Sequence, residues 1–141
     1  MLCLDVNVLI DLLQPRAERH AVVRAWLQDR VQAKERVLIL PDVAASFIRI
    51  ASSARLWQTP PSTTSAARAI RELCSTPMFS MAGATPRRLT IFFALLDRYS
   101  LTSMDVTDAF IVAGAVDLGA VLVSSDAGIS RFTELEVVHP T

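Results

Sequence analysis

The sequence predicts one three-layer α/β/α domain with a central, mostly parallel sheet, and three observations lead to this fold class. Short apolar runs alternate with longer segments whose apolar residues recur at helical spacing. The apolar runs lack a polar face, as strands buried on both sides of a parallel sheet do. The 141 residues are 52% hydrophobic, an ordinary size and composition for one domain with its own core. We therefore expect residues 1–141 to form a single domain with right-handed crossovers.

The first part of the chain predicts two strands, each followed by a helix. Residues 1–5 are a short apolar run and are expected to form a buried strand. Residues 16–32 carry apolar side chains at helical spacing, with charged and amide side chains between them, which predicts an amphipathic helix. Residues 37–40 form a second apolar strand. A helix then begins at Pro41-Asp42 and extends to about residue 53.

The middle of the chain predicts two helices with a strand between them. The proline pair at residues 60–61 breaks the chain, and Ser62 or Thr63 is expected to cap a helix that ends at about residue 74. Residues 78–81 are a third, weaker strand. Pro86 near a first turn predicts the next helix, over residues 85–99.

The last part repeats the alternation of strand and helix. Residues 106–118 predict a helix, and Gly119 fits the position that follows its end. Residues 121–124 form an apolar strand, residues 127–132 a short helix or turn, and residues 137–138 a brief last strand. In open parallel sheets of this kind, binding sites lie beyond the carboxyl ends of the strands.

Three aspartates occupy positions that such a fold can bring together. Asp5 ends the first strand, Asp126 follows the strand over residues 121–124, and Asp108 heads an apolar helix. If the two strands are neighbours, Asp5 and Asp126 emerge at one edge of the sheet, and Asp108 can reach the same edge. Carboxylates in one cleft repel one another, and a bound divalent cation relieves that repulsion. The first hypothesis is therefore an enzyme that uses Mg²⁺ or Mn²⁺.

Each aspartate also has an ordinary structural interpretation. Asp5 could cap a turn over residues 6–13, Asp126 could cap the short helix that follows it, and Asp108 could cap its own helix. The hypothesis of a metal site rests on the convergence of all three under one fold.

Charge and hydropathy restrict the function classes. The chain has 14 basic and 14 acidic residues, so it is not a general nucleic-acid binder, although every basic residue except Lys34 is an arginine, a side chain that grips phosphate. The apolar stretches are too short to cross a bilayer, and no basic segment precedes the first of them. We expect a cytoplasmic protein that does not bind membranes.

Four segments, in order, resemble those of PIN-domain ribonucleases. Asp5-Val6-Asn7-Val8-Leu9 is similar to the D-x-N-x-L opening of that family. Asp108, at the head of a helix of small residues, resembles the third acidic segment. The run from Val121 to Asp126 resembles the fourth, a strand that ends in Ser/Thr-x-Asp. Arg131-Phe132 is similar to the R-F pair that often follows in VapC-type toxins of bacterial toxin–antitoxin systems.

The resemblance implies a PIN-like fold and a metal-dependent endoribonuclease that hydrolyses structured RNA, either tRNA or rRNA. It implies that Asp5, Asp108 and Asp126 hold Mg²⁺ or Mn²⁺ and carry the catalysis. It also implies a homodimer that is held inactive by a cognate VapB-like antitoxin.

The sequence departs from the family at two positions. The family usually has a glutamate in the helix after the second strand, and here Ser46 occupies that position. Gly128 lies where many relatives carry another acid. Asp42, one turn before Ser46, could compensate in part, although an N-cap is its simpler role. Asp105, three residues before Asp108, could supply a further carboxylate or only a charge at the helix start.

Other polar residues have candidate supporting roles. Asn7 and Ser124 could hydrogen-bond a carboxylate of the site and orient it, or could be an ordinary turn residue and strand-end hydroxyl. Several arginines and a tryptophan could follow an RNA backbone, or could pair with nearby acids and pack in the core. These residues are Arg49, Arg55, Trp57, Arg87 and Arg88.

Two alternatives to the ribonuclease remain. The chain could be a non-catalytic or weakened PIN-like module that binds RNA or a partner, because Ser46 and Gly128 remove charge from the site. A phosphatase of the haloacid dehalogenase type would use Asp5 as nucleophile. That type needs a second aspartate where Asn7 lies and a catalytic lysine, and Lys34 is the single lysine available.

Overall fold

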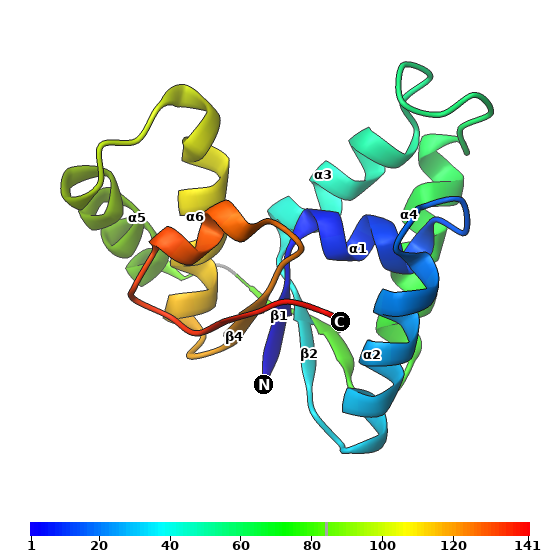
Figure 1. The fold of residues 1–141 in the computed structure, drawn as a ribbon, viewed down its shortest axis with the longest axis horizontal. Helices are drawn as coiled ribbons and strands as arrows, with labels where there is room; N and C mark the ends of the chain where they lie inside the picture. The colour runs from blue at the N-terminus through cyan, green and yellow to red at the C-terminus, as the bar shows by residue number, and fades with distance from the viewer. Residues whose placement is uncertain (84) are drawn as a thin grey trace.

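A computed structural model shows an open sheet covered by helices on both faces (Figure 1), and it describes residues 1–83 and 85–141. The five strands of the sheet are all parallel, and their order is β3-β2-β1-β4-β5. Their bounds are β1 Leu2–Leu4, β2 Val37–Ile39, β3 Phe79–Met81, β4 Val121–Val123 and β5 Val137–Val138.

The α-helices lie in two groups, one on each face of the sheet (Figure 1). Figure 1 shows α5 and α6 together on one side of the strands and α1 to α4 on the other. The α-helices are α1 Val6–Leu13, α2 His20–Gln32, α3 Pro41–Ala51, α4 Thr63–Ser75, α5 Pro86–Arg98 and α6 Val106–Asp117. Two short 3₁₀ helices are η1 Ser103–Asp105 and η2 Ala127–Arg131. The predicted three-layer α/β/α fold with a parallel sheet is confirmed.

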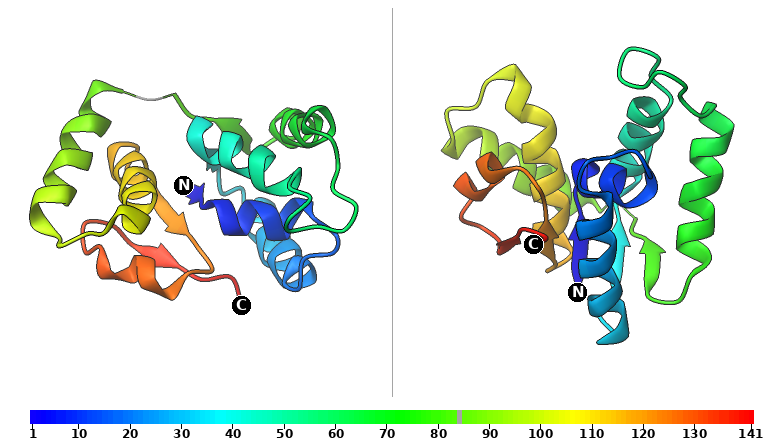
Figure 2. Two further views of the ribbon diagram at one scale, coloured as in Figure 1. Left: turned by 90° about the horizontal axis from the view of Figure 1, so that it is seen from above. Right: turned by 45° about the vertical axis from the view of Figure 1, so that its right-hand side comes forward.

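The direction in which strands are added to the sheet reverses between β1 and β4, and a crevice is expected at this point. From β1 the chain moves outward to β2 and β3, and it then returns to β4 on the other side of β1. Leu4 pairs with Val123, and the amide of Asp5 donates to the Val123 carbonyl at 2.9 Å. The connections that follow two such strands run to opposite faces of the sheet, which opens a crevice beyond the carboxyl ends of the strands. Seen from above, α6 and α1 lie on either side of β1 (Figure 2, left).

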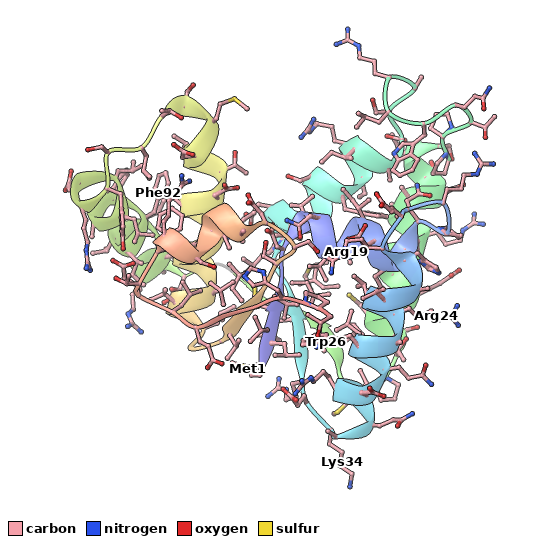
Figure 3. All side chains as sticks on the ribbon, in the orientation of Figure 1. Met1, Arg19, Arg24, Trp26, Lys34 and Phe92 are labelled. Carbon is pink, nitrogen blue, oxygen red and sulfur yellow. The ribbon has the colours of Figure 1, made fainter. Side chains whose placement is uncertain are left out.

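The core lies on both faces of β1 and β4 and includes most of α6. Ala109 and the run from Ile111 to Ala115 are buried, because α6 is covered by the sheet on one side and by α5 on the other. Phe92 of α5 lies between these two helices (Figure 3), and its ring meets the edge of Phe110 at a centroid distance of 5.2 Å. This packing fixes α6, and therefore the start of α6, against the sheet.

The elements differ from the sequence prediction mainly between β1 and α2. Val6–Leu13 forms a complete helix, where the sequence suggested only a turn capped by Asp5. Residues 16–19 are turns and not the beginning of α2, because Pro15 interrupts the chain and the His20 amide bonds the Ala17 carbonyl. The other predicted strands and helices are present, with ends shifted by a few residues. Within the residues described, none of the helices has the length and apolar character that a membrane crossing requires.

Candidate acidic active site

Asp5 lies at the carboxyl end of β1, and hydrogen bonds hold its carboxylate. Asp5 is 5% exposed. It is the N-cap of α1, and its Oδ1 accepts a hydrogen bond from the Val6 amide at 2.6 Å. Its Oδ2 accepts from Ser124 Oγ at 2.6 Å and from Asn7 Nδ2 at 2.8 Å. Because each oxygen of a carboxylate has two acceptor positions, Oδ1 keeps one position for a further partner.

Asn7 and Ser124 join β1 to β4 around this carboxylate. Asn7 Nδ2 also donates to Ser124 Oγ at 3.2 Å, and its Oδ1 accepts from the Ser125 amide at 2.9 Å. Ser124 is fully buried, and its Oγ accepts from the Asp126 amide at 3.0 Å. The expectation that these two residues orient a carboxylate agrees with the contacts, and that carboxylate belongs to Asp5.

Asp108 and Asp126 face the same pocket from two other elements. Asp108 lies in the first turn of α6, and exposed Asp126 caps η2, with Oδ1 accepting from the Gly128 amide at 2.8 Å. The pocket has a volume of about 320 Å³ and opens between α1, α3, α6 and the end of β4. The residues that line it include Asp5, Asn7, Ser46, Arg49, Thr107, Asp108 and Asp126. Segments from the two ends of the chain and its middle therefore meet at one place.

Burial and neighbouring charges raise the pKa values of two of the carboxyls in the pocket. Burial raises the pKa of Asp5, although the hydrogen bonds from Ser124, Val6 and Asn7 oppose that rise, and the charge of Asp126 adds to it. Burial also raises the pKa of Asp108, and the charges of Asp5 and Asp126 raise it further, against Arg131. A positive ion in the pocket would relieve both effects.

The donor set suits a hard cation, although the carboxylates are not arranged as a ready-made cage. No described residue donates a hydrogen bond to Asp108, whose Oδ2 lies 3.9 Å from Arg131 Nη2. Among residues 1–83 and 85–141, no three His, Cys, Asp or Glu side chains are close enough to ligate one ion together. Mg²⁺ keeps several waters and needs only one or two direct carboxylates, so oxygen ligands around this pocket fit it.

Comparison with known proteins decides the family. A family model described as the PIN domain matches residues 2–135 of this chain. The chain belongs to the PIN domain family. Ribonuclease VapC33 of Mycobacterium tuberculosis is 32% identical over 140 residues, which cover 99% of this chain and 98% of the relative. The resemblance drawn from the four sequence segments is therefore confirmed at the level of the family.

Solved structures of low sequence identity share the PIN fold along the whole chain. VapBC2 from Rickettsia felis, bound to a DNA fragment from its promoter, aligns with a TM-score of 0.72 at 13% identity and covers 98% of this chain and 97% of that one. VapC20 of M. tuberculosis, described as a sarcin-ricin loop cleaving toxin, aligns with a TM-score of 0.68 at 18% identity. That alignment covers 96% of this chain and 99% of the other.

The two positions at which this PIN domain departs from the usual acidic pattern differ in their surroundings. Ser46, in place of the usual glutamate, is half-buried on α3 and lines the pocket. Gly128 gives only its backbone amide to the site, through its hydrogen bond to Asp126. A carboxylate is therefore missing from the wall formed by α3, while the wall formed by η2 keeps Asp126.

Asp42 and Asp105 do not line the pocket, so neither replaces the missing glutamate. Both oxygens of Asp42 bond Arg88, at 2.8 and 2.9 Å, and the N-cap role that the sequence suggested falls to Leu40. Asp105 accepts from the Thr102 amide and from Arg131 Nη2, each at 2.7 Å. These contacts hold the pKa of Asp105 low, at about 2, and direct its carboxylate toward η1 and η2.

The arginines of this PIN domain divide between the two roles that the sequence left open. Arg49 is exposed and lines the acidic pocket, and Arg131 reaches the pocket edge beside Asp108. Arg88, for which the sequence left open an RNA contact or a pair with an acid, is 3% exposed and paired with Asp42. Arg87 and Arg88 are consecutive arginines at the start of a helix, and nothing in the sequence around them indicates that Arg88 is buried.

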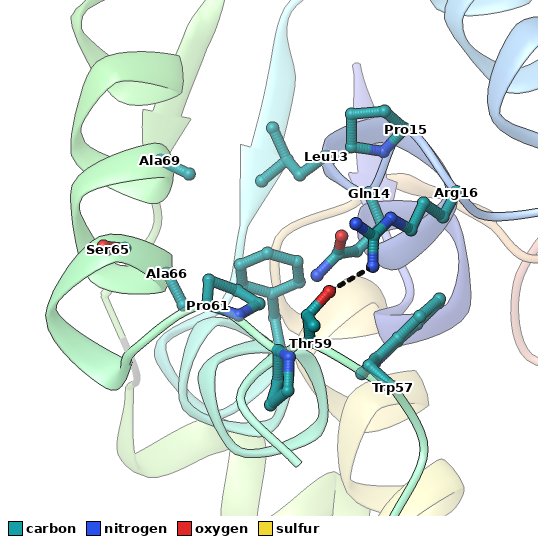
Figure 4. Close-up of a pocket in the computed structure, with 12 residues that line it drawn as sticks. Leu13, Gln14, Pro15, Arg16, Trp57, Thr59, Pro61, Ser65, Ala66 and Ala69 are labelled. Atoms are coloured by element: carbon teal, nitrogen blue, oxygen red, sulfur yellow. Dashed lines mark hydrogen bonds between the residues drawn. The ribbon is translucent and has the colours of Figure 1, made fainter. Parts of the chain in front are cut away.

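Trp57 lies away from the acidic pocket. It lines a second, largely apolar pocket of about 400 Å³ between α1, α3 and α4, together with Leu13, Phe47 and Pro61 (Figure 4). Its indole Nε1 donates to the Ile50 carbonyl at 3.1 Å, and Arg16 bonds Thr59 across the same pocket. The sequence left open for Trp57 either stacking on a base or packing in the core, and this placement, outside the acidic pocket, agrees better with packing.

Ser124→Ala is expected to destabilise the PIN domain by about 1–2 kcal/mol at neutral pH, because it removes a donor from the buried Asp5 carboxylate. The loss should shrink as the pH falls and Asp5 becomes protonated, since the lost bond stabilises the charged form. Urea unfolding at several pH values measures this effect, with exposed Ser103→Ala as control. An equal loss at every pH would contradict the link to Asp5.

Proposed function

We propose that this chain is the toxin of a VapBC-type pair and that it hydrolyses phosphodiester bonds of RNA with Mg²⁺ or Mn²⁺ at the acidic pocket. One observation carries the proposal: Asp5, Asp108 and Asp126, from remote segments, line one pocket at the carboxyl edge where the strand order reverses. The curated relative of 32% identity is named as a ribonuclease, which supports the same chemistry.

The three aspartates would hold the cation, one or two of them directly and the rest through water. When bound, the cation supplies positive charge to the phosphate and makes a coordinated water more acidic. Asp5 is held in place by Ser124, Asn7 and the Val6 amide, so its free acceptor position on Oδ1 has a fixed direction. Asp108, without a hydrogen-bond donor among the described residues, is available for the cation or its waters.

The substrate class we propose is structured RNA, as tRNA or rRNA. The exposed side chain of Arg49 lines the pocket and Arg131 lies at its edge, so both can contact phosphates beside the scissile bond. The solved relative VapC20 is described as cleaving the sarcin-ricin loop, which supports a folded RNA as target. The cytoplasmic location expected from the sequence belongs to this proposal, because such RNAs are found there.

The partners we propose are a second copy of the chain and a VapB-like antitoxin. The solved relative from R. felis is a complex of VapB with VapC, which supports an antitoxin partner. Size-exclusion chromatography with light scattering on the chain alone would measure the homodimer. A single species of monomer mass at micromolar concentration would contradict that part of the proposal.

The phosphatase alternative finds no support in the structure. Asn7 lies where that class has its second aspartate, and its amide is bonded to Asp5 and Ser124. Lys34 projects from the far end of α2, near the amino ends of the strands (Figure 3), and does not line the pocket. A catalytic lysine for Asp5 is therefore missing among the described residues.

The deciding experiment is cleavage of labelled tRNA and rRNA fragments by the purified protein with Mg²⁺, Mn²⁺ or EDTA. We expect cleavage with either metal, none with EDTA, and no hydrolysis of an aryl phosphate. Binding of RNA without cleavage under every metal condition would favour the non-catalytic module. Hydrolysis of the aryl phosphate with RNA left intact would favour the phosphatase.

Mn²⁺ is expected to raise the melting temperature by about 5–10 °C at a hundredfold excess over its Kd, because it binds only the folded pocket. The rise should be larger at about pH 8 than at about pH 5. The pKa values of Asp5 and Asp108 are raised, so protons compete with the metal for these carboxylates at the lower pH. Differential scanning fluorimetry measures both effects, and EDTA should reverse them. An unchanged melting temperature across the titration would count against the metal site.

A further inference from the structure

Arg88, in the first turn of α5, is a buried cation whose nitrogens are all hydrogen-bonded. Its Nη1 and Nη2 donate to the two oxygens of Asp42 at 2.8 and 2.9 Å. Its Nε and Nη2 donate to the backbone carbonyl of Phe110 at 3.1 and 2.8 Å. The side chain is 3% exposed, so this guanidinium makes its bonds to the protein and not to solvent.

The surface of α6 is shaped to accept this guanidinium. The Phe110 ring lies against it, with 3.8 Å between the ring centroid and Arg88 Cζ. A Cβ atom on Gly114 would lie 2.9 Å from Cζ and Nε of Arg88 and 2.7 Å from Leu40 Cδ1. A side chain at position 114 would therefore force the Arg88 guanidinium or the end of Leu40 to shift.

The bonds of Arg88 connect the two helices that form opposite walls of the acidic pocket. Phe110 lies two residues after Asp108 on α6, within the same turn. Asp42 lies one turn before Ser46 on α3. Burial raises the pKa of the Cys3 thiol on β1 to about 12, and the charges of Arg88, Asp42 and Asp5 act on the same thiol.

Stability alone does not account for an ion pair at this place. A buried pair loses hydration, and apolar residues of similar volume often stabilise a core equally well or better. The α5–α6 contact already has the packing of Phe92 against Phe110. What the forked guanidinium adds is a fixed distance between α3 and α6, because it must satisfy Asp42 and the Phe110 carbonyl together.

We propose that Arg88 is a positioning residue, which holds the Asp108 end of α6 against α3 and β1 so that the carboxylates face one pocket. The role rests on the proposed nuclease function for its catalytic consequence, but its structural consequence can be measured without RNA. Because metal affinity and turnover depend on ligand placement, both should fall when this bridge is removed.

The test compares Arg88→Met, Arg88→Lys and Gly114→Ala with Arg87→Met. Arg87 precedes Arg88 on α5, and its side chain is 70% exposed. Its 4.0 Å ion pair is with Asp117, at the opposite end of α6 from Asp108, and it does not line the acidic pocket, so it controls for the loss of a charge on the same turn. Three quantities are measured: hydrogen exchange of the amides in residues 106–112, the Kd for Mn²⁺ by calorimetry, and kcat and KM on one labelled RNA.

For Arg88→Met we expect about tenfold faster exchange in residues 106–112, Mn²⁺ affinity about tenfold weaker, and kcat lower by about 10–100-fold with KM nearly unchanged. Arg88→Lys should recover part of kcat, because an ammonium can bond Asp42 or the Phe110 carbonyl but cannot fork between them. Gly114→Ala keeps the arginine but crowds it and Leu40, and where the guanidinium shifts, kcat should fall to an intermediate value. Arg87→Met should keep the exchange rates, Mn²⁺ affinity and kcat of the wild type.

Wild-type exchange, Mn²⁺ affinity and kcat in a folded Arg88→Met protein would overturn the proposal, and so would equal losses in Arg87→Met. If Arg88→Met does not fold, Arg88→Lys decides, and wild-type exchange, Mn²⁺ affinity and kcat in that variant overturn the role of Arg88. A wild-type protein that cleaves no RNA would reject the nuclease function instead. The exchange rates would then still decide whether Arg88 holds the start of α6.

Discussion

Asp108→Asn is expected to lower the rate of RNA cleavage by about 10²–10³-fold and to leave the fold intact. The substitution removes a charge that faces the pocket, and it breaks no hydrogen bond among the described residues. Asp5→Asn should lower the rate as strongly, but it also places an amide against the donors Ser124 and Asn7. Asp108 is therefore the cleaner position at which to separate catalysis from stability.

The same substitution should stabilise the metal-free protein at neutral pH. The pKa of Asp108 is raised in the folded state, so its carboxyl favours folding at low pH and loses this contribution as the pH rises through the folded value. An asparagine lacks the unfavourable charge, and we expect the melting temperature without metal to rise by about 3 °C near neutral pH. The gain should disappear in acid.

Cleavage kinetics and melting curves with EDTA or Mn²⁺ measure these effects together, and exposed Asp97→Asn on α5 is the matched control. Asp97→Asn should cleave RNA at the wild-type rate and keep the response to Mn²⁺. Full activity of Asp108→Asn would remove this aspartate from the proposed site. Loss of activity with loss of the fold would show a structural role instead.

The acidic site could be predicted from the sequence because its parts follow from strand ends. Asp5 and Asp126 come directly after apolar runs that read as buried parallel strands, and such strands place their carboxyl ends at one edge. Asn7 and Ser124 lie within two residues of Asp5 and Asp126, so the pairing of β1 with β4 also brings Ser124 to Asp5, which is 119 positions away in sequence. Spacing along the chain was sufficient for these four residues.

Other features could not be predicted, because they depend on contacts between remote residues. Arg88 and Asp42 are 46 positions apart, and neither carries a local signal that the other will be its partner. Burial of this pair is decided by the space above Gly114, which only the packed helices define. The α1 helix was missed for a different reason: it has only eight residues, and its two polar side chains, Asn7 and Asp11, lie one turn apart and are too few to mark a helical period in so short a segment.

Ser46→Glu is expected to tighten Mn²⁺ binding by about tenfold and to raise kcat, because it returns a carboxylate to the one wall of the pocket that lacks it. The same change should lower the melting temperature without metal, since a fourth carboxylate adds repulsion to groups whose pKa values are already raised. Arg49, one turn later on α3, offsets part of that repulsion. Stability and metal affinity should therefore move in opposite directions.

Ala45→Glu is the matched control, because it adds the same side chain to the adjacent, exposed position of α3, outside the residues that line the pocket. It should leave Mn²⁺ affinity and kcat unchanged. Calorimetry and RNA cleavage at matched pH separate the two variants. If Ser46→Glu binds Mn²⁺ no more tightly than Ala45→Glu, position 46 does not face the cation. If it cleaves RNA where the wild type does not, serine at this position has weakened an otherwise intact nuclease.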